Sequence, residues 1–104
     1  MTVAREGRRA RTKHLDVRAL ASPLSHPRFG IVVPKRHRTT VDRNRVKRRI
    51  REIVRLYLLQ MAGSVDVVIR AQEQAYDAHF DELRTELVTV TQRLAQAVRK
   101  EGAS

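Results

Sequence analysis

The sequence predicts an α+β domain in which two helices pack on a small mixed β-sheet. Apolar and polar residues alternate at 14–19, which is the period of a half-buried strand. Two short β-branched runs follow, at 29–33 and 65–70. The apolar period becomes helical in two other segments, 46–61 and 80–98. The 104 residues suffice for one such domain, with the order strand, strand, helix, strand, helix.

The first two expected strands differ in pattern. The alternation at 14–19 puts apolar side chains on one face only. The run from Phe29 to Val33 is apolar or glycine throughout and ends at Pro34, so we expect a strand that is buried on both faces. A turn with two prolines and two serines separates the two strands.

The helix expected after the second strand is amphipathic. Thr39 and Thr40 are suitable N-cap residues, and Asp42 puts a carboxylate at the helix N-terminus. Gly63 and Ser64 are expected to end the helix. Its apolar stripe consists of Val46, Ile50, Ile53, Val54, Tyr57, Leu58 and Met61.

The last segment also has a helical apolar period, and the charged residues at its two ends interact favourably with the helix dipole. Acidic residues lie near its start, and Arg99 and Lys100 lie near its end. Its apolar repeat consists of Phe80, Leu83, Leu87, Val90, Leu94, Ala97 and Val98.

We expect residues 1–104 to form a single domain with less ordered ends. Residues 1–13 are polar and basic without a sustained period, which predicts a basic N-terminal arm, either solvated or ordered on a phosphate backbone. Residues 101–104 are expected to fray. If the strands at either end of 29–70 are parallel, the general rule predicts a right-handed crossover.

Charge is unevenly distributed along the chain. It contains 22 lysines and arginines and 11 acidic residues, so the net charge is +11. Residues 1–51 hold 16 basic and 3 acidic residues, whereas residues 52–104 hold 6 and 8. This asymmetry is typical of phosphate binding, although charge alone does not choose among DNA, RNA and lipid.

Composition also excludes several classes of protein. Without cysteine there is no disulfide framework, thiolate metal site or thiol nucleophile. No apolar run reaches the roughly 18–20 residues of a membrane span, and the Arg-rich start lacks the apolar core of a secretory signal. We therefore expect a soluble cytoplasmic protein.

The first helix carries a dense basic face. Six of the nine residues 43–51 are basic, and pairs such as Lys47 and Arg51 repel one another one turn apart. Glu52 is the only nearby counter-charge, so an external polyanion is expected to supply the rest. The alternatives are a merely solvated basic face and a helix on a membrane surface. Opposite the apolar stripe lie Asn44, Arg45, Arg48, Arg51 and Arg55, with Lys47 and Arg49 on the shoulders.

No catalytic constellation is visible. The phosphate-binding, zinc-protease and serine-hydrolase motifs do not occur, and the four histidines are scattered. Acidic pairs on the last helix, Asp77 with Asp81 and Glu82 with Glu86, leave a two-metal nuclease site conceivable, but a solvated face is the better interpretation. We expect a binding protein without catalytic residues or a bound metal of its own.

Residues 29–36 and 41–52 closely resemble the bacterial ribonuclease P protein component. The hallmark of that family is an Arg-Asn-Arg helix after a Val-rich strand and a basic loop, and Arg43-Asn44-Arg45 matches it. The strand at 65–70 and the closing helix complete the pattern, so the resemblance covers roughly residues 7–100.

The resemblance implies a fold and a function. The ribonuclease P protein-like fold, also called ribosomal S5 domain 2-like, is a four-stranded sheet with a rare left-handed β-α-β crossover. The family's protein is the cofactor of a ribozyme that removes the 5′ leader from precursor tRNA with Mg²⁺. The protein binds the catalytic RNA and the leader, and it contains no catalytic residues.

The resemblance also implies residue roles. Arg43, Asn44, Arg45 and Arg48 match positions that face the catalytic RNA. Lys47 and Arg51 match positions next to the leader. Together with the other basic residues of the loop and helix, the candidate RNA-binding residues are Arg43, Asn44, Arg45, Lys47, Arg48, Arg51, Arg55, Lys35 and Arg36.

The sequence departs from the family pattern near its start. Family members usually begin with a basic helix that carries a phenylalanine before a glycine matched here by Gly7, but no aromatic precedes Phe29. We therefore expect either a short member or a start that lies upstream. The aromatic often found on the leader-binding cleft of the first strand is also absent, since Asp16 and Val17 stand there. Leader binding is expected to rely on backbone charge rather than on base stacking.

Two other functions compete with this hypothesis. One is a structured-RNA-binding protein of ribosomal type without a processing role. The other is a DNA-binding regulator, which would need a recognition helix in a helical hairpin or a dimer, whereas the basic helix here lies between strands. The expected partners are the catalytic RNA and precursor tRNA, with no membrane and no DNA.

Overall fold

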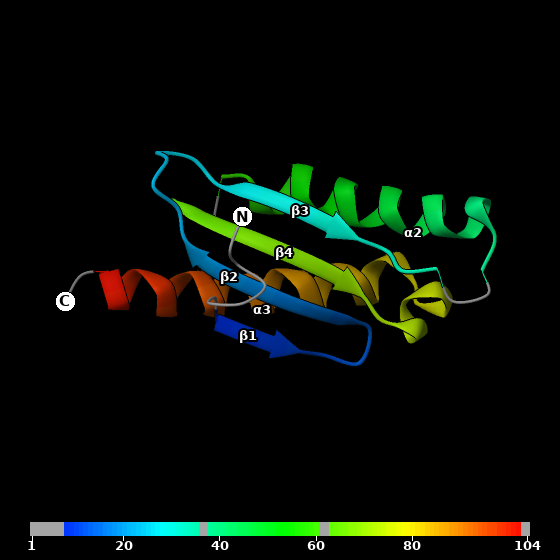
Figure 1. Ribbon diagram of the computed structural model, residues 1–104. Helices are drawn as coiled ribbons and strands as arrows, with labels where there is room; N and C mark the ends of the chain where they lie inside the picture. Colours follow the sequence, from blue (N-terminus) through cyan, green and yellow to red (C-terminus); the bar gives the residue numbers. More distant parts are fainter. Residues whose placement is uncertain (1–7, 36–37, 61–62, 103–104) are drawn as a thin grey trace.

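The computed structural model describes residues 8–35, 38–60 and 63–102 (Figure 1). Over these residues the chain forms a four-stranded sheet, two long helices and two short helical segments. Helix α2 continues directly into the π-helical turn η1, and the 3₁₀ helix η2 lies between β4 and α3. In chain order the elements are β1 (Arg8–Arg11), β2 (Leu15–Ala21), β3 (Arg28–Val32), α2 (Thr40–Ile53), η1 (Val54–Leu58), β4 (Val65–Ala71), η2 (Glu73–Asp77) and α3 (Phe80–Gly102).

The sheet has the strand order β1-β2-β4-β3. β2 pairs antiparallel with both β1 and β4, whereas β3 runs parallel to β4. Both α2 and α3 lie behind the sheet in Figure 1, so helices cover one face, and no described helix covers the other, which is called the open face below. The mixed sheet confirms the α+β class predicted from the sequence.

The alternation in the central strands separates the two faces. In β4, Val65, Val67 and Ile69 are buried toward the helices. The intervening residues of the same strand, such as Arg70, belong to the open face, because successive side chains of a strand point to opposite sides. The covered face packs against α2 and α3 in an aliphatic core formed largely by Leu15, Val17, Ile50, Ile53, Leu58, Leu83 and Leu87.

The connection from β3 through α2 to β4 is left-handed. The two strands are adjacent and parallel, and α2 lies behind them (Figure 1). This corrects the right-handed expectation and agrees with the fold that the resemblance implied. The cause is the uneven burial of β4, because Val65, Val67 and Ile69 are buried on the face that α3 also covers, whereas the other face carries charged residues such as Arg70 beside the half-buried Val68. A right-handed connection would place the apolar stripe of α2 against charged residues.

Two expectations about the strands were wrong. The run at 29–33 is not buried on both faces, because β3 is an edge strand and Val32 is 42% exposed on the open side. Residues 8–11 were expected in a basic arm but form β1. Only Ala10 in β1 is apolar, so the sequence of this strand shows no alternation of apolar and polar residues that would predict it. Arg9 is held by Asp16 of the neighbouring strand β2.

The helices follow the sequence more closely. The Thr39 hydroxyl accepts a hydrogen bond from the backbone N–H of Asp42 at 3.0 Å, which confirms the N-cap. Gly63 has φ +67° just before β4, a conformation that favours glycine. Helix α3 extends through Gly102, so residues 101 and 102 belong to the helix and not to a frayed tail, whereas Met61 lies outside the described residues. Among the described helices, none combines the length and apolar character required to cross a bilayer.

Candidate nucleic-acid interface

Helix α2 presents opposite chemistry on its two sides. Val46, Ile50 and Ile53 are buried in the core. The same helix exposes the cationic set Arg45, Lys47, Arg48 and Arg51, together with the amide of Asn44. Because the apolar side is fixed by packing, the cations of the other side are held on a rigid element facing solvent.

The four exposed cations are not neutralised by the described part of the chain. No carboxylate among those residues forms an ion pair with Arg45, Lys47, Arg48 or Arg51. Arg51 lies about one turn from both Lys47 and Arg48, so these charges repel one another. The face is therefore a positive surface that no described carboxylate compensates.

Three other arginines of α2 and η1 make contacts within the protein. Arg55 pairs with Glu52, with Nη2 at 2.5 Å from Oε1, and its hydrogen bond holds the pKa of the Glu52 carboxyl below its usual value. Arg43 donates from Nε and Nη2 to the carbonyl oxygen of Val33, at 3.3 and 3.2 Å. Arg49 donates to the carbonyl of Ala78 at 3.0 Å.

Of the nine predicted RNA-binding residues, seven therefore share α2 and the following turn. Arg43 is turned toward β3 and differs from the outward-facing members of the set. Lys35 is exposed in the loop before α2, and Arg36 lies outside the described residues.

The loop before α2 is anchored by a cluster that the sequence analysis did not identify. The Tyr76 hydroxyl donates to the carbonyl of Pro34 at 2.9 Å. Arg38 lies 4.5 Å from the centre of the Tyr76 ring and forms an ion pair with Glu73 at 3.1 Å. These contacts tie both ends of the basic loop to η2, and no short-range motif signals a pairing across more than 30 residues.

A groove separates the end of β3 from the first turns of α2. It encloses about 270 Å³. Its apolar lining comes from the strand and its polar lining from the helix. The lining residues are Ile31, Val32, Val33, Arg43, Asn44 and Lys47.

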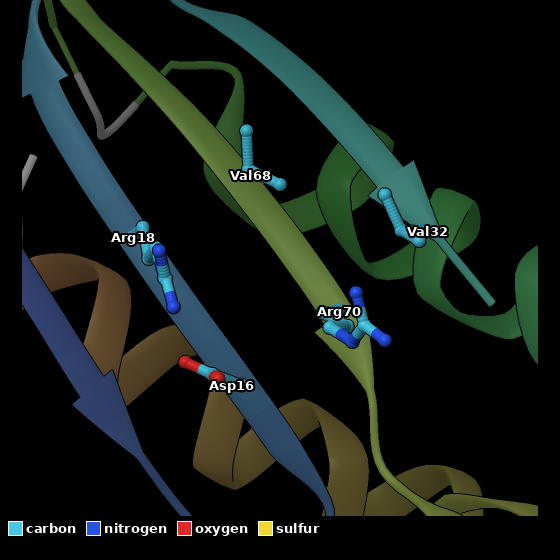
Figure 2. A pocket seen from close by; sticks show the side chains of 5 residues that line it. All are labelled: Asp16, Arg18, Val32, Val68 and Arg70. Atoms are coloured by element: carbon cyan, nitrogen blue, oxygen red, sulfur yellow. The ribbon is translucent and has the colours of Figure 1, made fainter. Parts of the chain in front are cut away.

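The open face of the sheet is a second charged surface. It carries a hollow of about 190 Å³ lined by Asp16, Arg18, Val32, Val68 and Arg70 (Figure 2). All five side chains lie on the side away from the helices in that view. Val32 lines both this hollow and the β3–α2 groove, so the two depressions share a residue at the edge of the sheet.

Two buried carboxylates organise the arginines of this face. Asp66 accepts two hydrogen bonds from Arg28, at 2.8 and 2.6 Å, and Asp16 accepts two from Arg9, at 3.0 and 2.7 Å. The Arg28 hydrogen bonds lower the pKa of Asp66. For Asp16, burial opposes ionisation, but the hydrogen bonds and charge of Arg9 with the charges of neighbouring arginines keep its pKa below the usual value.

The acidic residues of α3 take part in local structural contacts. Glu86 bonds to the buried His14 ring and to its backbone N–H, and Glu82 accepts from the backbone of His79 at 3.1 Å. Asp81 pairs with Arg84 at 3.6 Å. Over residues 8–35, 38–60 and 63–102, no group of three or more acidic or histidine side chains is arranged to hold a metal ion.

Comparison with known proteins identifies close relatives. Residues 1–95 match the profile of the family described as Ribonuclease P. The ribonuclease P protein component of Vibrio cholerae is 41% identical over 98 residues, which cover 93% of this chain and 82% of the relative. The protein of that name from Syntrophobacter fumaroxidans is 40% identical over 89 residues, covering 85% and 75%.

Solved structures show the same fold. The RNase P protein from Thermotoga maritima in complex with 1-(4-fluorophenyl)-2-thiourea superimposes with a TM-score of 0.79 at 24% identity, covering 88% of this chain and 89% of that one. The Staphylococcus aureus RNase P protein gives a TM-score of 0.72 at 22% identity, covering 97% and 85%.

Proposed function

The chain belongs to the ribonuclease P protein family, and from this premise we propose that the exposed face of α2 binds the catalytic RNA of that enzyme. The protein is an RNA-binding subunit of the ribonuclease P endoribonuclease, which matures the 5′ ends of tRNA and whose catalysis is carried by RNA. The alternative of a ribosomal-type protein without a processing role is not favoured by these relatives.

One observation carries the choice of surface. Arg45, Lys47, Arg48 and Arg51 lie exposed on one rigid helix, and the described carboxylates leave them unpaired. Guanidinium groups suit bidentate contact with phosphate, and their mutual repulsion is relieved when a polyanion binds. The same helix is held against the sheet by its buried side, so binding requires little reorganisation of the backbone.

For the 5′ leader of precursor tRNA, we propose a path along the border between α2 and the open face of the sheet. Lys47 lines the β3–α2 groove, and Val32 lines both that groove and the sheet hollow. Arg70 is exposed on the hollow side. A single strand crossing this edge would therefore meet cations on both sides of β3.

The Mg²⁺ of the reaction is proposed to bind to RNA and not to this chain. The acidic side chains of α3 are engaged with His14, His79 and Arg84, and the described residues offer no donor set suited to the octahedral preference of Mg²⁺. We also propose a cytoplasmic location, where precursor tRNA would be encountered.

The test is reconstitution with the cognate catalytic RNA and precursor tRNA at low Mg²⁺. Adding the protein is expected to increase leader cleavage, and the double variant Arg45→Ala/Arg48→Ala is expected to lose most of that gain. The charge-matched control is Arg93→Ala/Arg99→Ala, which removes two exposed arginines from α3. A wild-type protein that produces no gain would favour the ribosomal-type alternative, and equal losses in both double variants would rule out a specific role for α2.

A further inference from the structure

The segment that follows β4 fixes three points in and before α2. The Tyr76 hydroxyl of η2 donates to the carbonyl oxygen of Pro34 at 2.9 Å. The guanidinium of Arg38 lies over the ring of the same tyrosine, 4.5 Å from its centre. Farther along α2, Arg49 donates to the carbonyl oxygen of Ala78 at 3.0 Å. The start of α2 and the residues leading into it are therefore seated on η2.

The charge of Arg38 is used within the protein. Its guanidinium forms an ion pair with Glu73 at 3.1 Å and lies 3.9 Å from a carboxylate oxygen of Asp77. Its position over Tyr76 adds a cation–π attraction. Although Arg38 belongs to a basic stretch of sequence, its contacts make it a structural residue and leave little of its charge for phosphate.

Lys35 has the opposite character. It is exposed, it directly follows the carbonyl that Tyr76 holds, and no described carboxylate forms an ion pair with it. It adds a cation to the segment that leads into α2, whose exposed face is proposed to bind the catalytic RNA. Tyr76 therefore holds the backbone next to a charge that is available to RNA.

The anchor itself is rigid. Tyr76 packs against the hydrophobic core, so its hydroxyl is presented from a fixed element. A lysine on a freely moving backbone loses conformational freedom when it binds phosphate, and that loss weakens binding. Holding the preceding carbonyl removes part of this loss before the RNA arrives.

We propose that Tyr76 is a positioning residue of the RNA-binding surface, which holds Pro34 so that Lys35 meets a phosphate of the catalytic RNA from an already ordered backbone. The inference rests on the proposed function. Tyr76 acts through Lys35 and does not itself contact RNA. Among the described residues, the lining of the β3–α2 groove includes neither Tyr76 nor Lys35, so this role is separate from the path proposed for the leader.

A double-mutant cycle tests the proposal. Dissociation constants for the cognate catalytic RNA are measured with wild type, Tyr76→Phe, Lys35→Ala and the combined variant. Tyr76→Phe keeps the ring beside Arg38 and removes only the hydroxyl, and it should weaken binding about three- to tenfold, the range of one net hydrogen bond. In the Lys35→Ala background the same replacement should change the affinity by less than about twofold, because the positioned charge is gone.

Salt dependence separates positioning from direct contact. Lys35→Ala should reduce the slope of log K against log salt by about 0.7–0.9, the value for one phosphate contact. Tyr76→Phe should leave that slope close to the wild-type value, because Lys35 still reaches the phosphate after paying a larger ordering cost.

Two matched controls complete the design. Tyr57→Phe removes the hydroxyl of the other tyrosine, which lies beside α3, and should leave the affinity unchanged. Arg51→Ala removes a cation from the last turn of α2, and in that background Tyr76→Phe should weaken binding by its full factor. Thermal unfolding confirms that each variant is folded.

The outcomes distinguish this inference from the proposed function. Wild-type affinity in Tyr76→Phe or in Lys35→Ala would overturn the positioning role. So would an equal effect of Tyr76→Phe with and without Lys35, or an equal loss in Tyr57→Phe. In each of these cases the proposed function stands if Arg45→Ala/Arg48→Ala weakens binding of the catalytic RNA. Wild-type affinity in that α2 double variant would instead overturn the proposed RNA-binding face.

Discussion

Asp66 shows how single residues shape the open face of the sheet. Its carboxylate is buried in the middle of a charged surface, because the half-exposed Arg28 of the neighbouring edge strand covers it and donates two hydrogen bonds. Asp16 likewise accepts two hydrogen bonds from Arg9 of the other edge strand, β1. Each carboxylate thus fixes an arginine in a defined place and also removes part of its charge from the surface.

The Asp66–Arg28 pair predicts an acid-dependent contribution to stability. The pKa of Asp66 is lower in the folded protein than its ordinary value, so its contribution is complete above the unfolded-state pKa of about 4 and is lost as the pH falls through the lower folded-state pKa. We expect Asp66→Asn to reduce the free energy of unfolding at pH 7 by about 1 kcal/mol, since Arg28 is half exposed and partly screened.

Chemical denaturation at a series of pH values measures this effect. The difference between wild type and Asp66→Asn should shrink as the pH falls below about 4. A difference that stays constant from pH 7 to pH 3 would show that ionisation of Asp66 is not its cause.

Helix α2 is the element that joins folding to binding. Its buried side completes the core, and its exposed side supplies the cations. The basic loop before it is held in place by η2, because Tyr76 of η2 contacts both Pro34 and Arg38. The position of the cationic face therefore depends on contacts made by segments far away in the sequence.

The two sides of this helical segment should respond differently to truncation. Ile50 is fully buried, and Ile50→Ala is expected to lower the free energy of unfolding by about 3 kcal/mol through reduced apolar burial and the cavity left behind. Leu56, in the turn that follows, is 51% exposed, and Leu56→Ala should change stability by less than about 0.5 kcal/mol. Urea denaturation of both variants tests the prediction, and comparable losses of stability would contradict the assignment of the buried side.

At the scale of the whole molecule, charge is arranged by surface. The exposed face of α2 carries cations that form no ion pair with a described carboxylate, whereas arginines of the edge strands are partly balanced by Asp16 and Asp66. Near the start of α3 the surface is acidic, with Asp77, Asp81 and Glu82 exposed. This segregation favours one orientation of the protein on RNA, with α2 toward the phosphates.

Salt dependence measures how many of these cations bind phosphate. For binding to the catalytic RNA, Arg45→Ala/Arg48→Ala should lower the affinity and reduce the slope of log K against log salt by about 0.7–0.9 for each phosphate that is no longer neutralised. The control Arg93→Ala/Arg99→Ala removes the same charge from α3 and should leave the slope nearly unchanged. Identical slopes for wild type and both double variants would show that the α2 arginines do not contact phosphate.

The sequence by itself determined the elements whose period is set locally. The amphipathic α2, its Thr39 cap and the long α3 follow from apolar spacing and end chemistry, and the cationic set of α2 follows because residues opposite an apolar stripe must face solvent. The motif Arg43-Asn44-Arg45 is likewise contiguous in the chain, so the sequence alone indicated the family, and the relatives confirm it.

Only the tertiary structure decided which segments meet. β1 is a strand because it pairs with β2, with Asp16 also holding Arg9, and β3 is half exposed because it lies at the sheet edge beside the open face. The left-handed crossover follows from the uneven burial of β4, and the groove beside Arg43 exists only where β3 ends against α2. Each depends on contacts between distant residues, for which a local pattern carries no signal.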